Sequence, residues 1–310
     1  MADQLRWGVI GARSRIYRTR ILPPLEASGR HVVVAEASRD DDGSDRPYAR
    51  LLADPEVEAV YVPLPNDGHK RWVLAALEAG KHVLCEKPLT MSGADTAEVY
   101  EAARSAGRAL VEAYMWPHHP RSRAMLELGR SGLGALRFSR GVFTFPLGRP
   151  TDHRFDERGG GALFDVGIYC LGPALLLAPR EPIAVAASAV RNERGVDVSM
   201  AGLLDLGEGF SAAFEVSFET VYNRSFTLTG TAGRISFADW FAPGPEEPSE
   251  IEVLRLDESV ERFPVDGLNA YGAMLDQFAE VVRDGATPRW GADESMLLAR
   301  WIDALHAAAT

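Results

Sequence analysis

The feature that most constrains this fold is the alternation of short apolar runs with helix-like segments through residues 5–113. The apolar runs are nearly continuous, which is typical of strands buried on both faces of a parallel sheet. The expected strands cover residues 5–11, 31–37, 57–62, 82–85 and 108–113. Strands that alternate with helices form βαβ units, so this half is predicted to be an α/β Rossmann domain with a doubly wound parallel sheet.

The pattern changes after Pro117, where two-residue alternation replaces the continuous runs. Phe210, Ala212, Phe214, Val216 and Phe218 fall on one side of such a strand. The further strand-like segments are 135–145, 183–191, 196–206, 209–219, 224–230 and 233–237, with amphipathic helices at 271–283 and 293–309. We therefore expect a C-terminal α+β domain with a large, mostly antiparallel open sheet.

These patterns predict a dinucleotide-binding domain at residues 1–117 and a substrate-binding and dimerisation domain at residues 118–310. A chain of 310 residues is long enough for two such domains. Large exposed sheet faces usually find a cover, so we expect a homodimer or a dimer of dimers built on the second sheet.

Composition limits the partners of this chain. A net charge of -11 argues against nucleic acid, and no apolar run reaches membrane-spanning length. The N-terminus lacks the apolar core of a signal peptide. Cys85 and Cys170 are too few for a disulfide framework, and we expect them to be packing residues. The sequence predicts a cytoplasmic protein that binds a small molecule, with no nucleic acid or membrane partner.

Lys87 is the first candidate functional residue. Glu86-Lys87-Pro88 directly follows the strand at 82–85, and open α/β sheets bind ligands at that edge. Pro88 restricts Lys87 to extended backbone conformations, which would hold its ammonium group in one direction. The alternative is a surface lysine at a turn.

A dinucleotide fingerprint should follow the first strand, where this chain has Gly11, Ala12, Arg13, Ser14 and Arg15. Glycines there allow the backbone to approach a pyrophosphate at a helix N-terminus. Only Gly11 meets this requirement, because Arg13 replaces the expected second glycine. The two arginines can contact phosphate instead, and a plain tight turn is the alternative.

Ser38-Arg39 ends the second strand, where an acidic residue would hold the ribose of NAD. A serine and an arginine suit a 2′-phosphate, so NADP is favoured over NAD. The following Asp40-Asp41-Asp42 places negative charge nearby and works against this choice. An ordinary polar turn is the alternative.

The segment from Gly159 to Cys170 is the second informative motif. Its three glycines, Gly159, Gly160 and Gly161, allow close approach of another chain segment or a ligand. Asp165 and Tyr169 lie at i and i+4, on one face of a helix. Tyr169 can exchange protons if a cation lowers its pKa, although most tyrosines are half-buried packing residues.

The histidines do not form a metal site in this sequence. Adjacent His118 and His119 point different ways and have no evident third ligand, so we expect no metal. His153 and Arg154 lie in a loop flanked by proline and glycine, where they line a substrate mouth or are merely solvated.

Together these motifs resemble the Gfo/Idh/MocA oxidoreductase family, in its glucose-fructose oxidoreductase and dimeric dihydrodiol dehydrogenase branch. The resemblance rests on residues 60–66, on Glu86-Lys87-Pro88 and on residues 159–169, and it covers nearly the whole chain. It implies that Lys87 contacts substrate and nicotinamide ribose and allows a cis bond before Pro88. It also implies that Tyr169 is the catalytic acid/base and that Asp165 lies beside the substrate. The cofactor residues that it adds are Pro63, Leu64, Asn66, His69 and Glu86, and we expect Tyr114 and Trp116 to join His153 and Arg154 in the substrate wall.

The function expected from this resemblance is an NAD(P)-dependent oxidoreductase that interconverts a secondary alcohol and a ketone on a sugar-like or cyclic polyol substrate, compatible with secondary metabolism. Three departures fall near the expected cofactor cleft: the glycine loop, Pro117 in place of a usual arginine, and a shortened crossover between Arg39 and Leu51. The glycine loop and the crossover motivate a rival function. The crossover is expected to lack most of its helix and a short strand. The rival is non-redox acid/base chemistry (elimination, isomerisation or cyclisation) or ligand binding alone.

Overall fold

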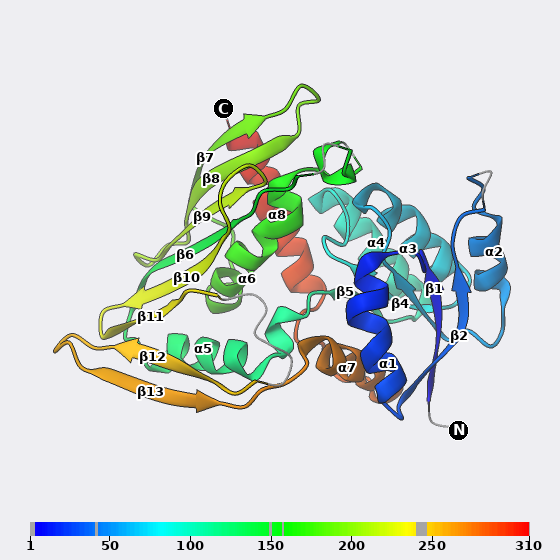
Figure 1. Ribbon diagram of the computed structural model, residues 1–310, viewed down its shortest axis with the longest axis horizontal. Helices are drawn as coiled ribbons and strands as arrows, with labels where there is room; N and C mark the ends of the chain where they lie inside the picture. Colours follow the sequence, from blue (N-terminus) through cyan, green and yellow to red (C-terminus); the bar gives the residue numbers. More distant parts are fainter. Residues whose placement is uncertain (1–3, 41–42, 149–150, 157, 240–246, 310) are drawn as a thin grey trace. The chain divides into compact units, whose positions relative to one another are not determined.

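The computed structural model describes residues 4–40, 43–148, 151–156, 158–239 and 247–309 (Figure 1). The chain divides into two compact units. The first comprises Met1–Met115 and Asn269–Ser295, and the second comprises Trp116–Leu268 and Met296–Thr310. The segment 269–295 therefore packs with the N-terminal sheet rather than with the other residues after 117. The separate cofactor and substrate roles of residues 1–117 and 118–310 stay a prediction.

The first unit is built on a five-stranded sheet in the order β2-β1-β3-β4-β5. All neighbouring strands are parallel, which confirms the Rossmann prediction. The strands are β1 (Leu5–Ile10), β2 (His31–Ala37), β3 (Ala59–Val62), β4 (His82–Glu86) and β5 (Leu110–Ala113). Because β2 and β3 lie on opposite sides of β1, the strand order reverses between β1 and β3. Ligands of open α/β sheets bind beyond the carboxyl ends of the strands at such a point.

Helices cover both faces of this sheet, because successive side chains of a strand point to opposite faces. On one face Trp7 of β1 lies 5.1 Å from Phe278, between ring centroids. On the other face, a Cβ atom at Gly8 would lie 2.7 Å from the Leu51 side chain, so glycine allows close packing against that helix. The helices of this unit are α1 (Leu22–Ala27), α2 (Arg46–Ala53), α3 (His69–Glu78), α4 (Gly93–Ala106) and α7 (Ala270–Asp284).

The structure corrects two expectations for the first unit. The shortened crossover keeps α2, an eight-residue helix that buries Tyr48, Leu51 and Leu52, so most of its helix is not lost. No strand lies between β2 and β3 within the described residues. The sequence of residues 14–25 also predicts a helix broken near Pro23-Pro24, and this prediction is wrong. The π-helical turn η1 (Tyr17–Ile21) leads directly into α1, and both prolines lie in its first turn, where a missing N–H is tolerated.

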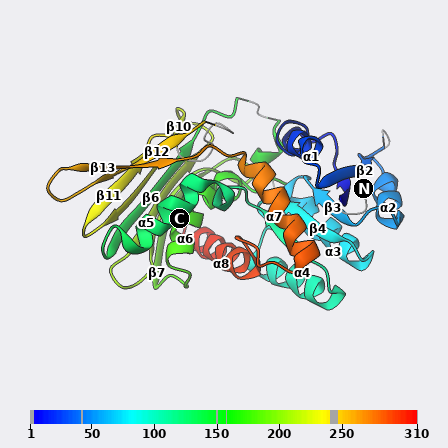
Figure 2. The same ribbon diagram turned by 90° about the horizontal axis from the view of Figure 1, so that it is seen from below.

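The second unit is built on an eight-stranded sheet in the order β13-β12-β11-β10-β6-β9-β8-β7, whose strands are labelled in Figure 1 and which Figure 2 shows from below. All neighbouring strands are antiparallel except β6 and β9, which confirms a mostly antiparallel sheet. The strands are β6 (Leu136–Thr144), β7 (Ala184–Arg191), β8 (Asp197–Asp205), β9 (Ser211–Ser217), β10 (Asn223–Gly230), β11 (Gly233–Phe237), β12 (Ser249–Leu254) and β13 (Val260–Val265). The last two form a hairpin that the sequence analysis missed.

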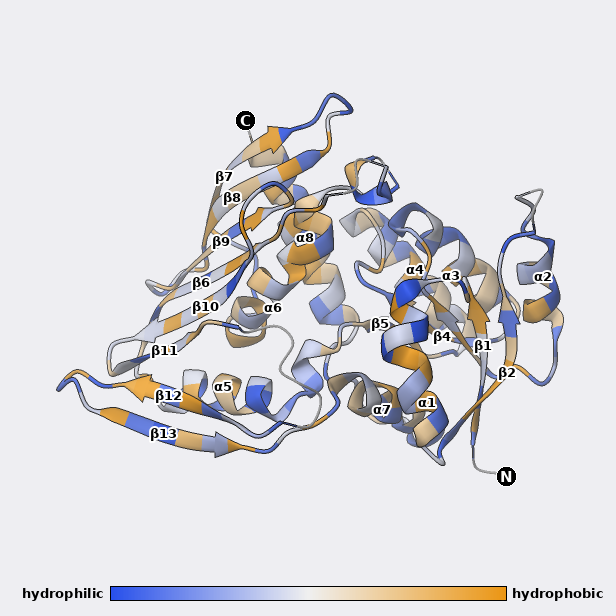
Figure 3. Cartoon of the chain, viewed as in Figure 1, coloured by the Kyte–Doolittle hydropathy of each residue, from blue (hydrophilic) through white to orange (hydrophobic). Residues whose placement is uncertain are grey.

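The two faces of the second sheet differ in burial. The predicted alternation is confirmed, since the five residues from Phe210 to Phe218 at every second position are all buried. Helices α5 (Pro120–Ser131), α6 (Ile168–Leu177) and α8 (Ala292–Ala308) complete the fold, and α6 packs on β6 and β9. Phe138, Val190 and Leu203 remain exposed, and Figure 3 shows apolar colours along the strands. One face is therefore available for a partner.

The structure also bears on membrane-spanning helices, metal ligands and the two cysteines. In the ranges given above, no helix has the length and apolar character needed to cross a membrane. Across the same residues no cluster of three His, Cys, Asp or Glu is arranged to hold a metal ion. Cys85 and Cys170 are buried free thiols, and burial raises the pKa of both.

Candidate active site

The carboxyl edge of the first sheet brings the turns after β1 and β3 into contact. Gly11 has φ of +105°, and a Cβ atom there would lie 2.9 Å from the Leu64 side chain. The Ser14 N–H donates to the Gly11 carbonyl at 2.9 Å and closes the turn. Position 11 therefore needs glycine for both its conformation and its space. That this turn holds a pyrophosphate stays a prediction.

Glu86 anchors the backbone at Lys87. Its carboxylate is buried and accepts the Tyr61 hydroxyl at 2.6 Å and the Lys87 N–H at 3.3 Å. Burial raises the pKa of Glu86, while the Tyr61 hydrogen bond and the Lys87 charge lower it. The Lys87-Pro88 bond is cis, as the family resemblance allowed. Lys87 thus leaves β4 at the edge where ligands bind.

A second buried carboxylate, Glu112 of β5, holds the chain beyond Pro88. It accepts the Leu89 N–H at 2.8 Å, the Trp290 indole N–H at 2.8 Å and the Ser295 hydroxyl at 2.5 Å. Burial raises the pKa of Glu112, and the Lys87 charge is among the influences that lower it. Lys87 is therefore electrostatically coupled to two buried acids. The sequence analysis missed Glu112, although an acidic residue within an apolar strand was the available signal.

His69 connects the turns after β3 and β4. It is fully buried, with Nδ1 2.8 Å from the Pro88 carbonyl and Nε2 2.8 Å from the Leu64 carbonyl. Burial lowers the pKa of this ring. His69 faces the backbone at both nitrogens, so it holds these two turns together. Pro63 and Leu64 belong to the same turn, and Asn66 begins the 3-10 helix η2 (Asn66–Gly68).

Cations gather beside the turns after β1 and β2. Burial raises the pKa of Tyr48, whereas the charges of Arg39 and Arg13 lower it, so both arginines lie near this phenol. Arg39 is exposed and its Nε donates to Asp45 at 3.0 Å. Asp45 also accepts from Arg71 at 2.8 Å.

The sequence reasoning missed Tyr48, which marks this cluster. Arg15 is exposed and Ser38 is half-buried, while Asp41 and Asp42 lie outside the described residues. Two arginines from separate turns fit a phosphate-bearing cofactor, because one guanidinium group can donate two parallel hydrogen bonds to a phosphate.

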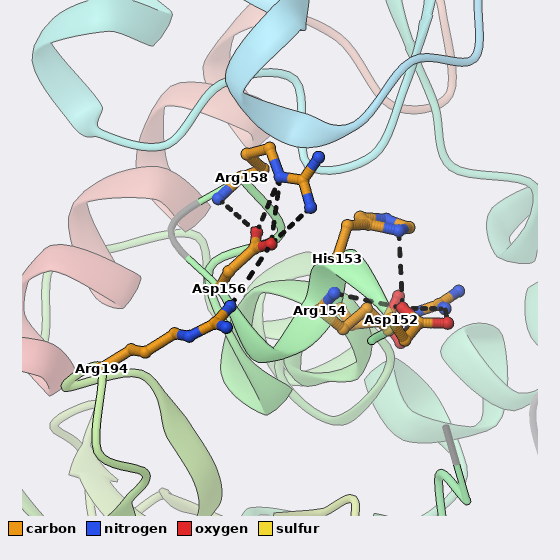
Figure 4. A network of polar contacts seen from close by, with 7 residues as sticks. Asp152, His153, Arg154, Asp156, Arg158 and Arg194 are labelled. Atoms are coloured by element: carbon orange, nitrogen blue, oxygen red, sulfur yellow. Dashed lines mark hydrogen bonds and ion pairs between the residues drawn. The ribbon is translucent and has the colours of Figure 1, made fainter. Parts of the chain in front are cut away.

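In the second unit, Arg154 joins two carboxylates (Figure 4). Its Nε donates to Asp165 at 2.8 Å and its Nη1 to Asp152 at 3.1 Å. These charges raise the pKa of Arg154. His153 Nδ1 lies 3.4 Å from Asp152. Asp152 was not among the predicted site residues. The predicted pair His153 and Arg154 therefore lies in an ionic network with Asp165.

Asp165 and Tyr169 share the less buried face of one helical run. Asp165 lies in the π-helical turn η5 (Leu163–Gly167) and Tyr169 in the first turn of α6. Both are half-buried, whereas the other residues of 163–170 are buried. The Tyr169 ring lies 5.7 Å from Phe143. A carboxylate, a phenol and the Arg154 guanidinium therefore occupy neighbouring positions of the second unit.

The glycines before this run serve contacts within the chain. A Cβ atom at Gly159 would lie 2.5 Å from Arg154 Cα, and one at Gly161 would lie 2.6 Å from the Asp197 carbonyl. Close approach of another chain segment, one of the two alternatives for this motif, is thus the observed one.

The two aromatic predictions for the substrate wall receive less support. Tyr114 is fully buried, with its ring centroid 4.8 Å from that of Trp290, and Trp116 is buried too. Such burial is typical of packing residues and does not support a place in the substrate wall. His119 is the N-cap of α5, where Nδ1 accepts the Arg121 N–H at 3.0 Å. Burial lowers the pKa of His119 to about 4, so it is neutral at physiological pH.

Comparison with known proteins identifies the class to which this fold and these residues belong. Residues 5–114 match the model of an oxidoreductase family with an NAD-binding Rossmann fold, and residues 122–236 match the GFO/IDH/MocA C-terminal domain. The chain belongs to the Gfo/Idh/MocA family of oxidoreductases.

The individual relatives are also oxidoreductases. D-xylose 1-dehydrogenase (NADP(+)) 2 of Haloferax volcanii is 34% identical, over 98% of this chain and 97% of that protein. Trans-1,2-dihydrobenzene-1,2-diol dehydrogenase of Mus musculus is 33% identical, over 77% of this chain and 76% of that protein. A crystal structure of the 3-ketoreductase KijD10 from Actinomadura kijaniata, in complex with NADP and TDP-benzene, matches with a TM-score of 0.88. That match has 33% identity and covers 99% of this chain and 98% of the other. The same ketoreductase has been solved with a lysine or a tyrosine replaced.

Proposed function

We propose that this chain is an NADP-dependent oxidoreductase that interconverts a secondary alcohol and a ketone on a sugar-like substrate. The observation that carries the proposal is the placement of Lys87 at the carboxyl end of β4, held by Glu86, in a member of this family. The relatives named above act on, or are solved with, sugars, diols or a nucleotide derivative. All are redox enzymes, so the non-redox rival gains no support from them.

The residues fit a bound dinucleotide. Gly11 has a positive φ and lets the turn after β1 pack closely against Leu64, and Arg13, Arg39 and Ser38 would hold phosphate groups near this turn. A bound nicotinamide cofactor would donate or accept the hydride. The absence of an acid at the end of β2 favours NADP over NAD.

The proton chemistry is assigned to residues of both units. The Tyr169 hydroxyl gives its proton to the carbonyl oxygen during reduction and takes it back during oxidation. We assign to Lys87, as the family resemblance implies, the polarisation of the substrate oxygen. Asp165, held by Arg154, accepts hydrogen bonds from substrate hydroxyl groups. His153 and Arg154 line the substrate mouth.

We also propose a homodimer or dimer of dimers and a cytoplasmic location. The exposed apolar residues Phe138, Val190 and Leu203 support an interface on the second sheet. Buried thiols without disulfides at Cys85 and Cys170 fit a reducing compartment.

The proposal is tested by following NADPH absorbance with a panel of aldoses, cyclic diols and nucleotide-linked keto sugars. With an accepted substrate, Tyr169→Phe should lower turnover by roughly 10²–10⁴-fold, because it removes only the hydroxyl, while NADPH affinity stays unchanged. Lys87→Ala should lose at least as much. The double variant should lose less than the product of the two, since both residues act on one proton transfer.

Tyr222→Phe is the matched control, because Tyr222 is 57% exposed and contacts Arg224 in the second unit. It should keep full turnover. Near-normal turnover of Tyr169→Phe would show that the proton passes elsewhere.

A further inference from the structure

The helical run that carries Asp165 and Tyr169 begins without a cap of its own. Ala162, the N-cap of η5, has helical backbone angles and no side-chain capping bond. Gly160 and Gly161 precede it and have no side chains to offer. The first N–H groups of a helix have no partner within the helix, so another part of the chain must accept them.

Asp197, the first residue of β8, supplies the missing acceptor. Its side chain is buried, and Oδ2 accepts the Leu163 N–H at 2.8 Å from 34 positions further along the chain. The backbone N–H groups of Leu163 and Ala162 both lower the pKa of the Asp197 carboxyl. Asp197 therefore caps η5 from a strand of the sheet, as a local aspartate would cap an ordinary helix.

Gly161 is shaped to this carboxylate. A Cβ atom at position 161 would collide with Asp197 Oδ1 and would lie 2.6 Å from the Asp197 carbonyl oxygen. Its φ of +97° is a conformation that glycine adopts without strain. The glycine motif and Asp197 thus form a single arrangement.

The cap is close to the proposed acid–base residues. Asp165 follows Leu163 by two positions, and its N–H donates to the Gly161 carbonyl at 3.1 Å. Tyr169 follows by six positions on the same run. A shift of the Leu163 backbone would therefore move Asp165, its partner Arg154 and the Tyr169 hydroxyl together.

The charges around Asp197 are few. Arg191 is its register partner on β7 and is the cation that lowers its pKa. On α8, His306 lies with its ring 5.1 Å from Phe164 of η5, and burial lowers the pKa of this histidine. Asp197 Oδ1 has no hydrogen-bond partner among the residues that the structure describes. Burial outweighs the amides and raises the pKa of Asp197 to about 6.

We propose that Asp197 is a positioning residue, whose side-chain oxygen caps the helical run of Asp165 and Tyr169 and holds both side chains in working geometry. The proposal rests on the proposed function for its catalytic consequence. The cap itself is independent of the reaction.

The test compares Asp197→Ala and Asp197→Asn in the full chain by hydrogen–deuterium exchange of peptides from 160–170. Alanine removes the acceptor, so exchange there should rise about tenfold, as expected for the loss of one charged hydrogen bond. Asparagine keeps an oxygen for the Leu163 N–H and should restore slow exchange. Asp205→Ala is the matched control, because Asp205 ends the same strand and accepts the Gly207 N–H at 2.9 Å in a remote turn.

Turnover with an accepted substrate supplies the second measurement. Asp197→Ala should lower kcat about tenfold or more with a smaller change in KM, Asp197→Asn should recover most of it, and Asp205→Ala should match the unmodified chain. Wild-type exchange or wild-type kcat in Asp197→Ala would overturn the proposal, as would an asparagine variant that exchanges as fast as the alanine one. If no substrate is turned over, the proposed function fails while exchange still decides the cap.

If Asp197→Ala does not fold, the pH dependence of exchange decides instead. The capping N–H groups lower the pKa of Asp197, so they bind the carboxylate more strongly than the neutral acid, and in the unmodified chain the exchange of 160–170 should fall below the intrinsic pH trend as pH rises through about 6. Asp197→Asn should lack this pH effect, and its persistence there would refute the role of the carboxyl.

Discussion

Replacing Asp197 with asparagine should stabilise the protein at neutral pH. The carboxyl has a pKa of about 6 in the folded chain, against an ordinary value of 3.8, because burial disfavours its charged form. The difference corresponds to about 3 kcal/mol of folding free energy at neutral pH. Asparagine keeps the acceptor for Leu163 and never carries the charge.

The sign of the pH dependence follows from linkage. Between the unfolded and folded pKa values the folded chain binds one more proton, so its stability falls as pH rises through that range. The penalty is absent below pH 3.8, grows up to about pH 6 and is complete above it. The advantage of Asp197→Asn should thus grow by about 2 kcal/mol from about pH 4.5 to about pH 7.5. Any cost of burying the asparagine amide group does not depend on pH, so it cancels when the advantage at the two pH values is compared.

Urea unfolding followed by circular dichroism at several pH values measures this advantage directly. Asp205→Asn is the control, since Asp205 is less buried and serves a turn at the far end of β8. A stability difference between Asp197→Asn and the unmodified chain that stays constant with pH would refute the reasoning. So would an advantage that shrinks as pH rises.

Two further predictions concern the cofactor and the assembly. Arg39→Ala should weaken the binding of NADPH by about tenfold to a hundredfold relative to that of NADH, because a charged hydrogen bond to the 2′-phosphate is lost. Asp45→Asn should strengthen NADPH binding, most clearly at low salt, because Arg39 loses its ion pair with Asp45. Equal affinities of the intact chain for NADPH and NADH in calorimetry would contradict both predictions. Leu203→Arg should convert a dimer to monomers in light scattering, whereas Leu256→Arg, in the exposed turn between β12 and β13, should not. A monomeric unmodified chain at micromolar concentration would exclude the interface.

Much of the fold could be predicted because its signals are local. The continuous apolar runs of β1, β3, β4 and β5 match strands buried on both faces, whereas β2 is an edge strand that is buried only at its ends. The alternation from Phe210 to Phe218 matches one buried face. The missed hairpin of β12 and β13 also alternates, with Ile251 and Val253 buried between acidic residues. Its strands are longer than β11, which was predicted, so the alternation was an available signal for this hairpin too.

The error at Pro23-Pro24 has a different origin. Proline ends a helix only where its N–H is needed, and the π-helical turn before α1 places both prolines where it is not. Sequence periodicity does not reveal such a turn, because one extra residue in the helix shifts the register without changing composition.

The sequence by itself determined the class of the fold and the residues of its main motifs. Strand and helix periods are set by neighbouring residues, and Glu86-Lys87-Pro88 follows its strand directly, so both can be predicted from short segments. Only the tertiary structure decided which polar groups support those motifs. Glu112 reaches Trp290 and Asp197 reaches Leu163. His69 connects two separate turns. These contacts depend on packing between segments that are distant in the sequence. Burial there removes the side chains of Glu112, Asp197 and His69 from water and shifts their pKa values, and hydrogen bonds within the protein offset the lost hydration.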